Sequence, residues 1–482
     1  MSYVRKAKKR PYADRVNKFI RDFPDLLYDG AKIYCKLCEK ALMCWDKRDC
    51  RNHVNTSQHR SRKQVLPSKT GFLFDLLFTM IACNLPLRLL DATPFRDFWN
   101  KYNPELKLPS ARKARKHVPP LREEVERQIK SKLNNQRLWL CVDETTDCKK
   151  NYIVNVIVRV LDPCKPTYPL LLASKRLQDC TDATITRVVL DTLEHFQIST
   201  SQVLMFMSDG TKTMCKVGRS LQEHNWRFLH VTCKMHALRL VEEYIRKRFP
   251  GIDALITNTK KVFLKSPERI KTFHRQCPGI PEPPQPIPTE WGTWLKAVFY
   301  YSEYFQQIKA VVLLFNPDDT TAIKESQSKF QDISLETDVH TVHNTYKLLH
   351  EAIENLQDTV LPLGKSLKIL DEVNTLLRDV SDAKTACVLE EFESVLNKDS
   401  DFITLREICD GTSTHSLSPF KDCFSYACIT SVDVKRSLSQ YKQVFSPKRT
   451  SFQETTVETY LMLSMFYKSY PNWREHLNFN TR

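Results

Sequence analysis

Four residues near the start of the sequence have the types and the spacing of a zinc site. Two residues separate Cys35 from Cys38, and His53 and His59 follow after a gap of fourteen residues, with five between them. Zn²⁺ prefers four soft or borderline ligands in a tetrahedron, and two ligand pairs at such spacings supply them. A segment this small cannot bury a core of its own, so bound metal must stabilise it, by about 10–16 kcal/mol in comparable finger peptides. We therefore expect one structural zinc ion here.

Two further cysteines compete as ligands in this segment. They are Cys44 and Cys50, and Cys50 stands three residues before His53. Because residues at that spacing share one face of a helix, a swap of one ligand is compatible with the sequence.

The residues around the ligands indicate what the finger binds. No proline or glycine interrupts residues 45–64, so we expect one helix that carries both histidines. In a ββα finger such a helix enters the major groove, where Arg and Lys reach phosphates and guanine edges. The alternative is a solvated basic helix that binds a protein. The candidate DNA-contacting residues are Lys47, Arg48, Arg51, Arg60, Arg62 and Lys63.

The composition also favours a nucleic-acid partner. Lys and Arg number 73 against 56 Asp and Glu, which gives a formal net charge of +17. Such an excess favours phosphate binding, because neutralised phosphates release counterions. The basic cluster at residues 5–10 is typical of a nuclear import signal or a phosphate-binding arm, so we expect a location in the nucleus.

Other sequence features argue against secretion and against a membrane. No apolar run follows the basic start, and the most apolar long stretch, residues 71–90, is interrupted by charges and a proline. The sixteen cysteines follow no regular framework, which indicates a reducing, intracellular environment. We expect neither a membrane partner nor a small-molecule substrate.

The length of 482 residues indicates several domains, and changes of pattern divide the chain into five parts. Residues 1–66 hold the basic arm and the finger, and residues 67–136 form short helices. Residues 137–250 alternate strands with helices. Residues 251–400 hold a proline-rich connector and a helical insertion, and residues 401–482 return to the core. Strands separated by helices predict a multidomain α/β protein.

Two acids stand at matching positions among the predicted strands. The strands at residues 138–142 and 203–207 are followed by Asp143 and Asp209. Carboxylates at the ends of neighbouring strands can converge on Mg²⁺, and two such ions support phosphodiester chemistry. The alternative is that each Asp caps a turn, as the Asp-Gly pair at 209–210 would. Further strands are expected at 152–158 and 169–172, and a helix at 183–195.

The sequence around these acids resembles the hAT superfamily of transposases. Residues 141–147, 207–210, 232–238 and 429–439 carry the resemblance, with the sequences CVDETTD, MSDG, TCKMHAL and ITSVDVKRSLS. Residues 445–466 are similar to the family's C-terminal dimerisation segment. The N-terminal third resembles CGG triplet repeat-binding proteins. Together these similarities imply a BED-like zinc finger, an RNase H-like core interrupted by an all-α insertion, and a homodimer.

The resemblance also assigns roles and reveals two departures from the family. Asp143 matches the first catalytic acid and Asp209 the second, but the third position holds Lys435 where a Glu is expected. The family has an Arg before the Trp of a segment that handles the DNA hairpin end, and here Glu290 precedes Trp291. Trp291 could still stack on a base, whereas Glu290 would repel phosphate. Both departures replace a needed charge with its opposite.

Three smaller features have structural interpretations. Asp433 stands two residues before position 435, so on a helix its side chain would lie on a different face. Cys233 and His236 look like half a metal site, but no second pair stands nearby, so we expect core packing. A second basic run at residues 112–117 is equally compatible with a solvated helix face.

These observations leave three functional hypotheses. We favour a nuclear protein that binds double-stranded DNA, derived from a hAT transposase, without catalytic activity and acting in transcription or chromatin regulation. The alternative is an active transposase that depends on Mg²⁺, with Asp143 and Asp209 as catalytic residues. The third is a protein–protein adaptor whose basic finger binds no DNA, for which affinity would not depend steeply on salt.

Overall fold

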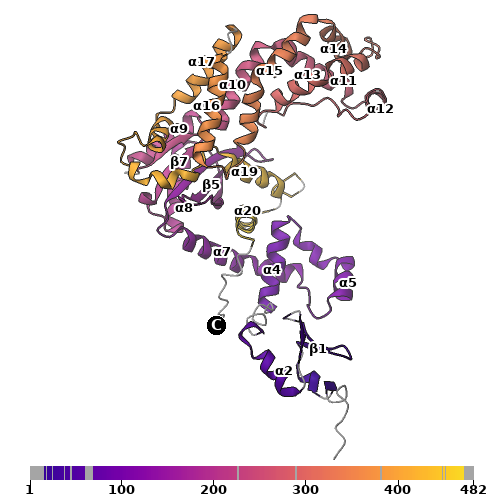
Figure 1. Cartoon of the computed structure of the whole chain (residues 1–482), viewed down its shortest axis with the longest axis vertical. Helices are drawn as coiled ribbons and strands as arrows, with labels where there is room; N and C mark the ends of the chain where they lie inside the picture. Colours follow the sequence, from indigo (N-terminus) through magenta and orange to yellow (C-terminus); the bar gives the residue numbers. More distant parts are fainter. Residues whose placement is uncertain are drawn as a thin grey trace, which may run out of the picture. The chain divides into compact units, whose positions relative to one another are not determined.

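The computed structural model forms two compact units (Figure 1). Residues 1–80 and 86–118 make up the first unit, and residues 81–85 and 119–482 make up the second. The basic cluster at 5–10, Cys44, Arg60, Arg62 and Lys63 lie outside the described residues. The structure describes residues 16–17, 19–23, 25–36, 38, 40–43, 46–59, 69–224, 227–287, 290–379, 383–447, 449–450 and 452–471.

The first unit begins with a small antiparallel sheet in the order β1-β2-β3. A short 3₁₀ turn, η1 (Ile20–Asp22), precedes β1 (Leu26–Tyr28), β2 (Ile33–Cys35) and β3 (Lys40–Leu42), and the helix α2 (Lys47–Val54) follows. The core of this finger segment is one small cluster in which cysteines are prominent: Val16, Phe23, Leu26, Ile33, Cys35, Cys38 and Cys50. So few apolar side chains agree with the expectation that metal must help to stabilise the segment.

A group of short helices completes the first unit and leads into the second. These are α4 (Lys69–Ala82), η2 (Leu87–Asp91), α5 (Thr93–Tyr102), α6 (Ala111–Lys116) and the longer α7 (Val118–Leu133). Pro94 lies in the first turn of α5, where its missing N–H would be unpaired in any case.

The second unit is built on a mixed sheet of five strands in the order β6-β5-β4-β7-β8. β4 pairs antiparallel with β5 and β5 with β6, whereas β4 pairs parallel with β7 and β7 with β8. The multidomain α/β class is therefore confirmed, and all four predicted strands are present, although the first and the third run four and five residues further than predicted. The strands are β4 (Leu138–Thr146), β5 (Tyr152–Val160), β6 (Leu170–Leu177), β7 (Val203–Ser208) and β8 (Leu229–Thr232).

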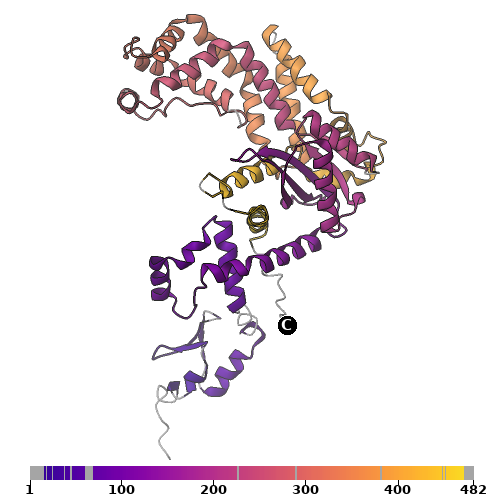
Figure 2. The same ribbon diagram turned by 180° about the vertical axis from the view of Figure 1, so that it is seen from behind.

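Helices cover this sheet, and several are contributed by the C-terminal end of the chain (Figure 2). The predicted helix at 183–195 is α8 (Asp182–Phe196). After the helical region the chain returns, so that α19 (Val432–Val444) packs on β4 and β5 and α20 (Glu454–Ser469) packs on β6. The remaining elements of this layer are η3 (Thr200–Gln202), α9 (Lys212–Glu223), α10 (Lys234–Arg248), α18 (Ser400–Asp410) and η4 (Ser418–Tyr426).

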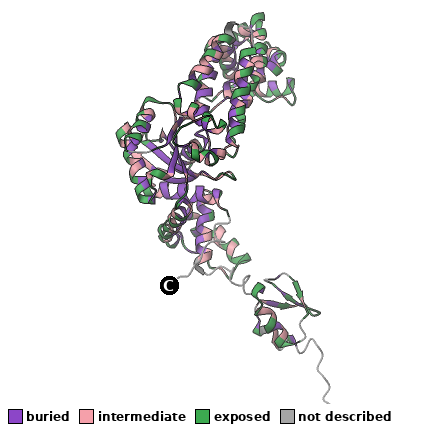
Figure 3. Ribbon diagram, turned by 60° about the vertical axis from the view of Figure 1, so that its left-hand side comes forward, coloured by how far each residue is buried: buried purple, intermediate pink, exposed green. Residues whose placement is uncertain are grey.

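A long helical region separates the strands from α19, as the sequence predicted. Residues 279–287 of the predicted proline-rich connector form neither helix nor strand. Figure 3, a ribbon coloured by burial, shows buried residues along the strands of the sheet and along parts of the helices. None of the described helices is both long and apolar enough to cross a membrane. The helices of this region are α11 (Pro250–Phe263), α12 (Pro267–Gln276), α13 (Thr293–Val312), α14 (Thr321–Gln331), α15 (Ile333–Asn355), α16 (Leu363–Asp379) and α17 (Ala383–Asn397).

Candidate functional site

The predicted zinc ligands come together in the finger. One ligand atom from each of Cys35, Cys38, His53 and His59 lies within 4.8 Å of the others. Nδ1 of His59 is 3.4 Å from Sγ of Cys35, 3.7 Å from Sγ of Cys38 and 3.3 Å from Nε2 of His53. A tetrahedral Zn²⁺ with its usual bond lengths separates its ligands by about 3.3–3.8 Å. The group could therefore hold a metal ion such as zinc.

The chain positions these ligands with a hairpin and a helix. Cys35 ends β2. The backbone N–H of Cys38 donates to Sγ of Cys35 at 3.3 Å, which holds the two thiols on one side of the turn. His53 lies in the last turn of α2. The competing ligand Cys50 is fully buried in the finger core and is not part of the four-residue group.

The helix differs from the predicted one, because α2 ends at Val54 and does not carry both histidines. The chain turns at Asn55, and the hydroxyl of Thr56 donates to the carbonyl of His53 at 2.8 Å and accepts the N–H of His59 at 3.2 Å. Asn and Thr side chains compete with helical hydrogen bonds in this way. The turn brings His59 back toward the cysteines.

A fifth residue, which the spacing did not reveal, supports the group. Nε2 of His59 lies 3.4 Å from a carboxylate oxygen of Asp25, while its Nδ1 faces the other ligands. A carboxylate that binds the second ring nitrogen fixes the tautomer and the orientation of a metal-binding histidine. The donor set and this contact both fit a zinc site.

The helix α2 presents basic side chains to solvent. Lys47 is paired with Asp22 and is half exposed. Arg48 and Arg51 are exposed, one helical turn apart. The three predicted DNA-contacting residues that the structure describes in the finger are thus accessible, and their contacts with DNA stay a prediction.

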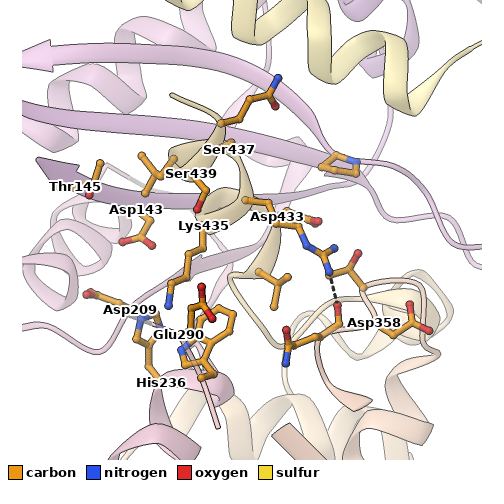
Figure 4. Close-up of a pocket in the computed structure, with 18 of the residues that line it drawn as sticks. Asp143, Thr145, Asp209, His236, Glu290, Asp358, Asp433, Lys435, Ser437 and Ser439 are labelled. Carbon is orange, nitrogen blue, oxygen red and sulfur yellow. Dashed lines mark hydrogen bonds between the residues drawn. The ribbon is translucent and has the colours of Figure 1, made fainter. Parts of the chain in front are cut away.

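A second candidate site is a cavity of about 1340 Å³ at the sheet in the second unit. Asp143 near the end of β4 and Asp209 just after β7 both line it, with Glu144, Glu290 and Lys435. Figure 4 shows the side chains of Asp143, Asp209, Glu290 and Lys435 pointing toward one another. The structure therefore brings together the two predicted acids and both positions that depart from the family pattern.

Burial raises the pKa values of the two acids in β4, Asp143 and Glu144. Burial, followed by the charge of Asp209, raises the pKa of Asp143 to about 7. The same two causes raise the pKa of Glu144 to about 7. Asp209 is more accessible and accepts the N–H and the hydroxyl of Thr211 at 3.1 and 2.7 Å, so it also caps a turn. Asp143 was predicted to follow the strand, but it lies within β4, because pairing with β5 extends the strand to Thr146. Glu144 was missed because a second acid beside a predicted catalytic Asp carries no distinct signal in one sequence.

Lys435 supplies a cation inside this acidic cavity. Its Nζ lies 3.7 Å from the centre of the Trp291 ring, a cation–π contact. Burial and then the charge of Arg239 lower the pKa of Lys435, while Asp143 and Glu290 act in the opposite direction. The ammonium group of Lys435 thus covers one face of the Trp291 ring. Stacking of a base on the part of the ring that is left stays a prediction.

The segment that carries Glu290 and Trp291 is held by a buried carboxylate from α10. Glu242 accepts the backbone N–H groups of Gly292, Trp294 and Leu295, each at 3.1 Å, and so caps the start of α13. Gly292 has φ +70°, and a Cβ there would meet a side-chain carbon of Ile353 at 3.0 Å. Only glycine suits this turn, which aims Trp291 at Lys435.

The remaining sequence predictions concern neighbours of the cavity. Asp433 points away from Lys435 and forms a buried ion pair with Arg159, with the guanidinium Nε 2.7 Å from the carboxylate, as expected for a helix. Cys233 is buried and accepts the N–H of Ser431 at 3.1 Å, which fits the expected packing role. Among the described residues, neither Cys233 nor His236 belongs to a group that could hold a metal.

His236 does more than the packing role that was expected. Its ring lies edge-on to Trp291 at 5.8 Å between centroids and lines the cavity. Although burial lowers the pKa of His236, the neighbouring Cys233 and then the acidic groups of Asp143 and Asp209 raise it above its usual value. The cavity therefore combines carboxylates with cationic groups of its own.

A scan with protein-family models finds no match to this sequence, and a search of curated proteins finds no significantly similar relative. The fold and the finger define a multidomain α/β protein with a Cys₂His₂-type metal group. The likeness to hAT transposases rests on the motifs quoted above.

Proposed function

We propose that this chain is a nuclear DNA-binding protein derived from a hAT-type transposase, with a zinc-dependent BED-like finger for DNA recognition. Its RNase H-like core serves as a scaffold and has no strand-transfer activity. Regulation of transcription or chromatin is the role that such a protein would serve.

One observation carries the proposal that the core is inactive: Lys435 projects into the cavity that Asp143 and Asp209 line. An ammonium group cannot ligate Mg²⁺. At an effective dielectric constant of 20 it would repel a divalent ion 4 Å away by about 8 kcal/mol. Because metal ions supply most of the rate in two-metal phosphodiester chemistry, losing them removes catalysis.

The finger supports the DNA-binding half of the proposal. Its four ligand atoms lie within 4.8 Å of one another, and the exposed Arg48 and Arg51 lie on the helix that a ββα finger places in the major groove. A bound Zn²⁺ would fix the hairpin against that helix. We expect Cys38→Ser to abolish specific DNA binding.

One observation favours the alternative, an active enzyme. Glu144 places a third carboxylate in the cavity beside Asp143 and Asp209, without any acid at position 435. A site of three carboxylates is a reasonable Mg²⁺ ligand set. The two functions therefore have to be separated by experiment.

The test is Mg²⁺-dependent nicking of duplex DNA by the purified chain. We expect no cleavage by the unmodified protein, and we expect the double change Lys435→Glu with Glu290→Arg to be a better rescue than Lys435→Glu alone. The double change removes the cation at the metal site and the anion at the DNA end.

Asp209→Ala serves as the control for contaminating nucleases. Mg²⁺-dependent nicking by the unmodified protein that disappears in Asp209→Ala would show that the active-transposase hypothesis is correct.

A further inference from the structure

The short helix α6 has two faces of opposite character. Ala111 and Ala114 are 1% and 0% exposed and belong to the side that packs on η2. The other positions carry cations, and all four are exposed: Arg112, Lys113, Arg115 and Lys116. We call these four residues the α6 basic patch.

The patch is held in place by the elements around it. Asp91 of η2 accepts the backbone N–H of Ala111 at 3.0 Å, and the hydroxyl of Ser110 accepts that of Lys113 at 3.2 Å. Arg96 of α5 donates to the carbonyl of Pro109 at 3.1 Å, and the Trp99 indole donates to that of Leu106 at 2.6 Å. Both the helix start and the loop before it are therefore fixed.

This rigid placement is maintained against electrostatic repulsion. Arg112 with Arg115, and Lys113 with Lys116, are like-charged pairs one helical turn apart. Each such pair costs about 0.2–0.5 kcal/mol in a helix. In the part of the chain that the structure describes, no acidic group lies within ion-pair distance of the patch to offset this. A partner with regularly spaced negative charges would remove the repulsion.

The surroundings have the same sign. Residues 86–117, which include η2, α5 and α6, contain eight Lys and Arg against three Asp and Glu. One of the three acids, Asp91, is already engaged by Ala111 and by Arg96. The chemistry that fits is a polyanion approached by side chains without base-specific geometry.

We propose that the α6 basic patch is a second nucleic-acid contact, which binds the phosphate backbone of duplex DNA independently of the finger. It adds affinity that does not depend on base sequence, while the finger supplies recognition. The choice of duplex DNA as the polyanion rests on the proposed function. The patch itself rests on exposure, packing and charge.

The test compares the full chain with a variant in which all four patch residues are changed to Gln, which preserves helix propensity. DNA binding is measured by fluorescence anisotropy on a duplex of random sequence, over a range of salt concentrations. Each lost phosphate contact should reduce the slope of log K against log salt by about 0.9, so four lost contacts reduce it by about 3.6. A change in this slope of less than about 0.9, the value expected for one phosphate contact, overturns the proposal.

A matched control removes four exposed lysines from the second unit: Lys247, Lys261, Lys324 and Lys398. The patch proposal requires a clearly larger change in slope than this control gives, and an equal change would assign the effect to net charge. The Cys38→Ser finger variant should keep the part of the slope that the patch supplies.

Two further arms separate the remaining outcomes. If the unmodified chain binds no DNA at all, the proposed function fails. If it binds DNA with the same slope as the patch variant, only the patch inference fails. Binding of a poly-aspartate peptide is measured in the same way. If the unmodified chain binds this peptide more tightly than the patch variant does, while the two bind DNA equally, the partner is an acidic protein and the DNA assignment is overturned.

Discussion

Asp25 shows how a residue outside the ligand motif can control a metal site. Its carboxylate lies 3.4 Å from Nε2 of His59, the ring nitrogen opposite the one that faces the other ligands. Loss of such a partner typically lowers metal affinity about 10–100-fold. We expect Asp25→Ala to weaken zinc binding by this factor in competition with a chromophoric chelator.

Asp22→Ala is the control, because it removes an exposed carboxylate of the same finger that pairs with Lys47 and touches no ligand. An equal loss of affinity in both variants would mean that net charge matters and that the orientation of His59 does not.

Asp143 has a consequence for stability that depends on pH. Its pKa in the folded protein is raised to about 7 by burial and by Asp209, whereas an unfolded Asp titrates near 3.9. The folded state therefore holds a proton that the unfolded state releases between about pH 4 and pH 7, so stability falls as the pH rises through this window. Above pH 7 the charged, buried carboxylate contributes a penalty.

We expect Asp143→Asn to stabilise the second unit at pH 8 by on the order of 1 kcal/mol and to have little effect near pH 4. The Asn carbonyl can still accept the N–H that Glu144 donates to Asp143 at 2.9 Å. Urea denaturation at several pH values measures the difference, with the exposed Asp318→Asn as control. A gain that is equal at pH 4 and pH 8 would exclude this explanation.

At the scale of elements, the turn before α13 depends on one carboxylate. Glu242 accepts three backbone N–H groups of that helix start, and its own pKa is raised by burial even though those donors act against the shift. Glu242→Ala would leave these donors buried and unpaired, at about 1–3 kcal/mol for each that water cannot reach. We expect a loss of at least about 2 kcal/mol in the free energy of unfolding.

The neighbouring Glu243 provides a matched control on the same helix. It is partly exposed and pairs with Arg239 one turn away, so Glu243→Ala should cost at most about 1 kcal/mol. The Glu242 variant should also change the fluorescence of Trp291, since the turn it caps carries that ring toward Lys435. Unchanged fluorescence would show that the turn is held by other contacts.

The elements differ in how well the sequence could predict them. The continuous apolar run Leu138–Val142 predicts a buried strand, and β4 follows it. The polar residues that extend β4 to Thr146 gave no such signal, because they are ordered by pairing with β5 as far as Tyr152. The end of α2 at Val54 was missed because side-chain hydrogen bonds at Thr56 decided it, against a run without proline or glycine.

The candidate sites show the same division. The finger ligands were predictable because their spacing along the chain is local. Glu242, Trp291 and Lys435 come from distant parts of the sequence, and their contacts follow from the packing of α10, α13 and α19. The resemblance to transposases selected positions 290 and 435, but that the Lys435 ammonium lies over the Trp291 ring could not be read from the residue types.

At the scale of the whole molecule, the apolar C-terminal residues have a use within one chain. The sequence linked them to a dimer, and the structure buries α20 against β6, with Val457, Leu461 and Leu463 fully buried. This packing accounts for their apolar character without a second copy. The homodimer that the resemblance implies therefore stays a proposal, and in the described residues its contact surface would have to lie outside the buried face of α20.

Light scattering across micromolar concentrations, with and without DNA, tests this proposal, and we expect twice the mass of the chain. Leu461→Ala should lower the free energy of unfolding by about 2–5 kcal/mol, because it leaves a cavity in the core, and should keep the mass unchanged. Leu240→Ala, at a position on α10 that is 52% exposed, is the control and should change neither quantity appreciably. A monomer under all conditions would remove the dimer. A dimer that Leu461→Ala dissociates while the chain stays folded would instead place α20 at the interface, since substitution of a residue that only packs within its own subunit weakens the fold before it weakens association.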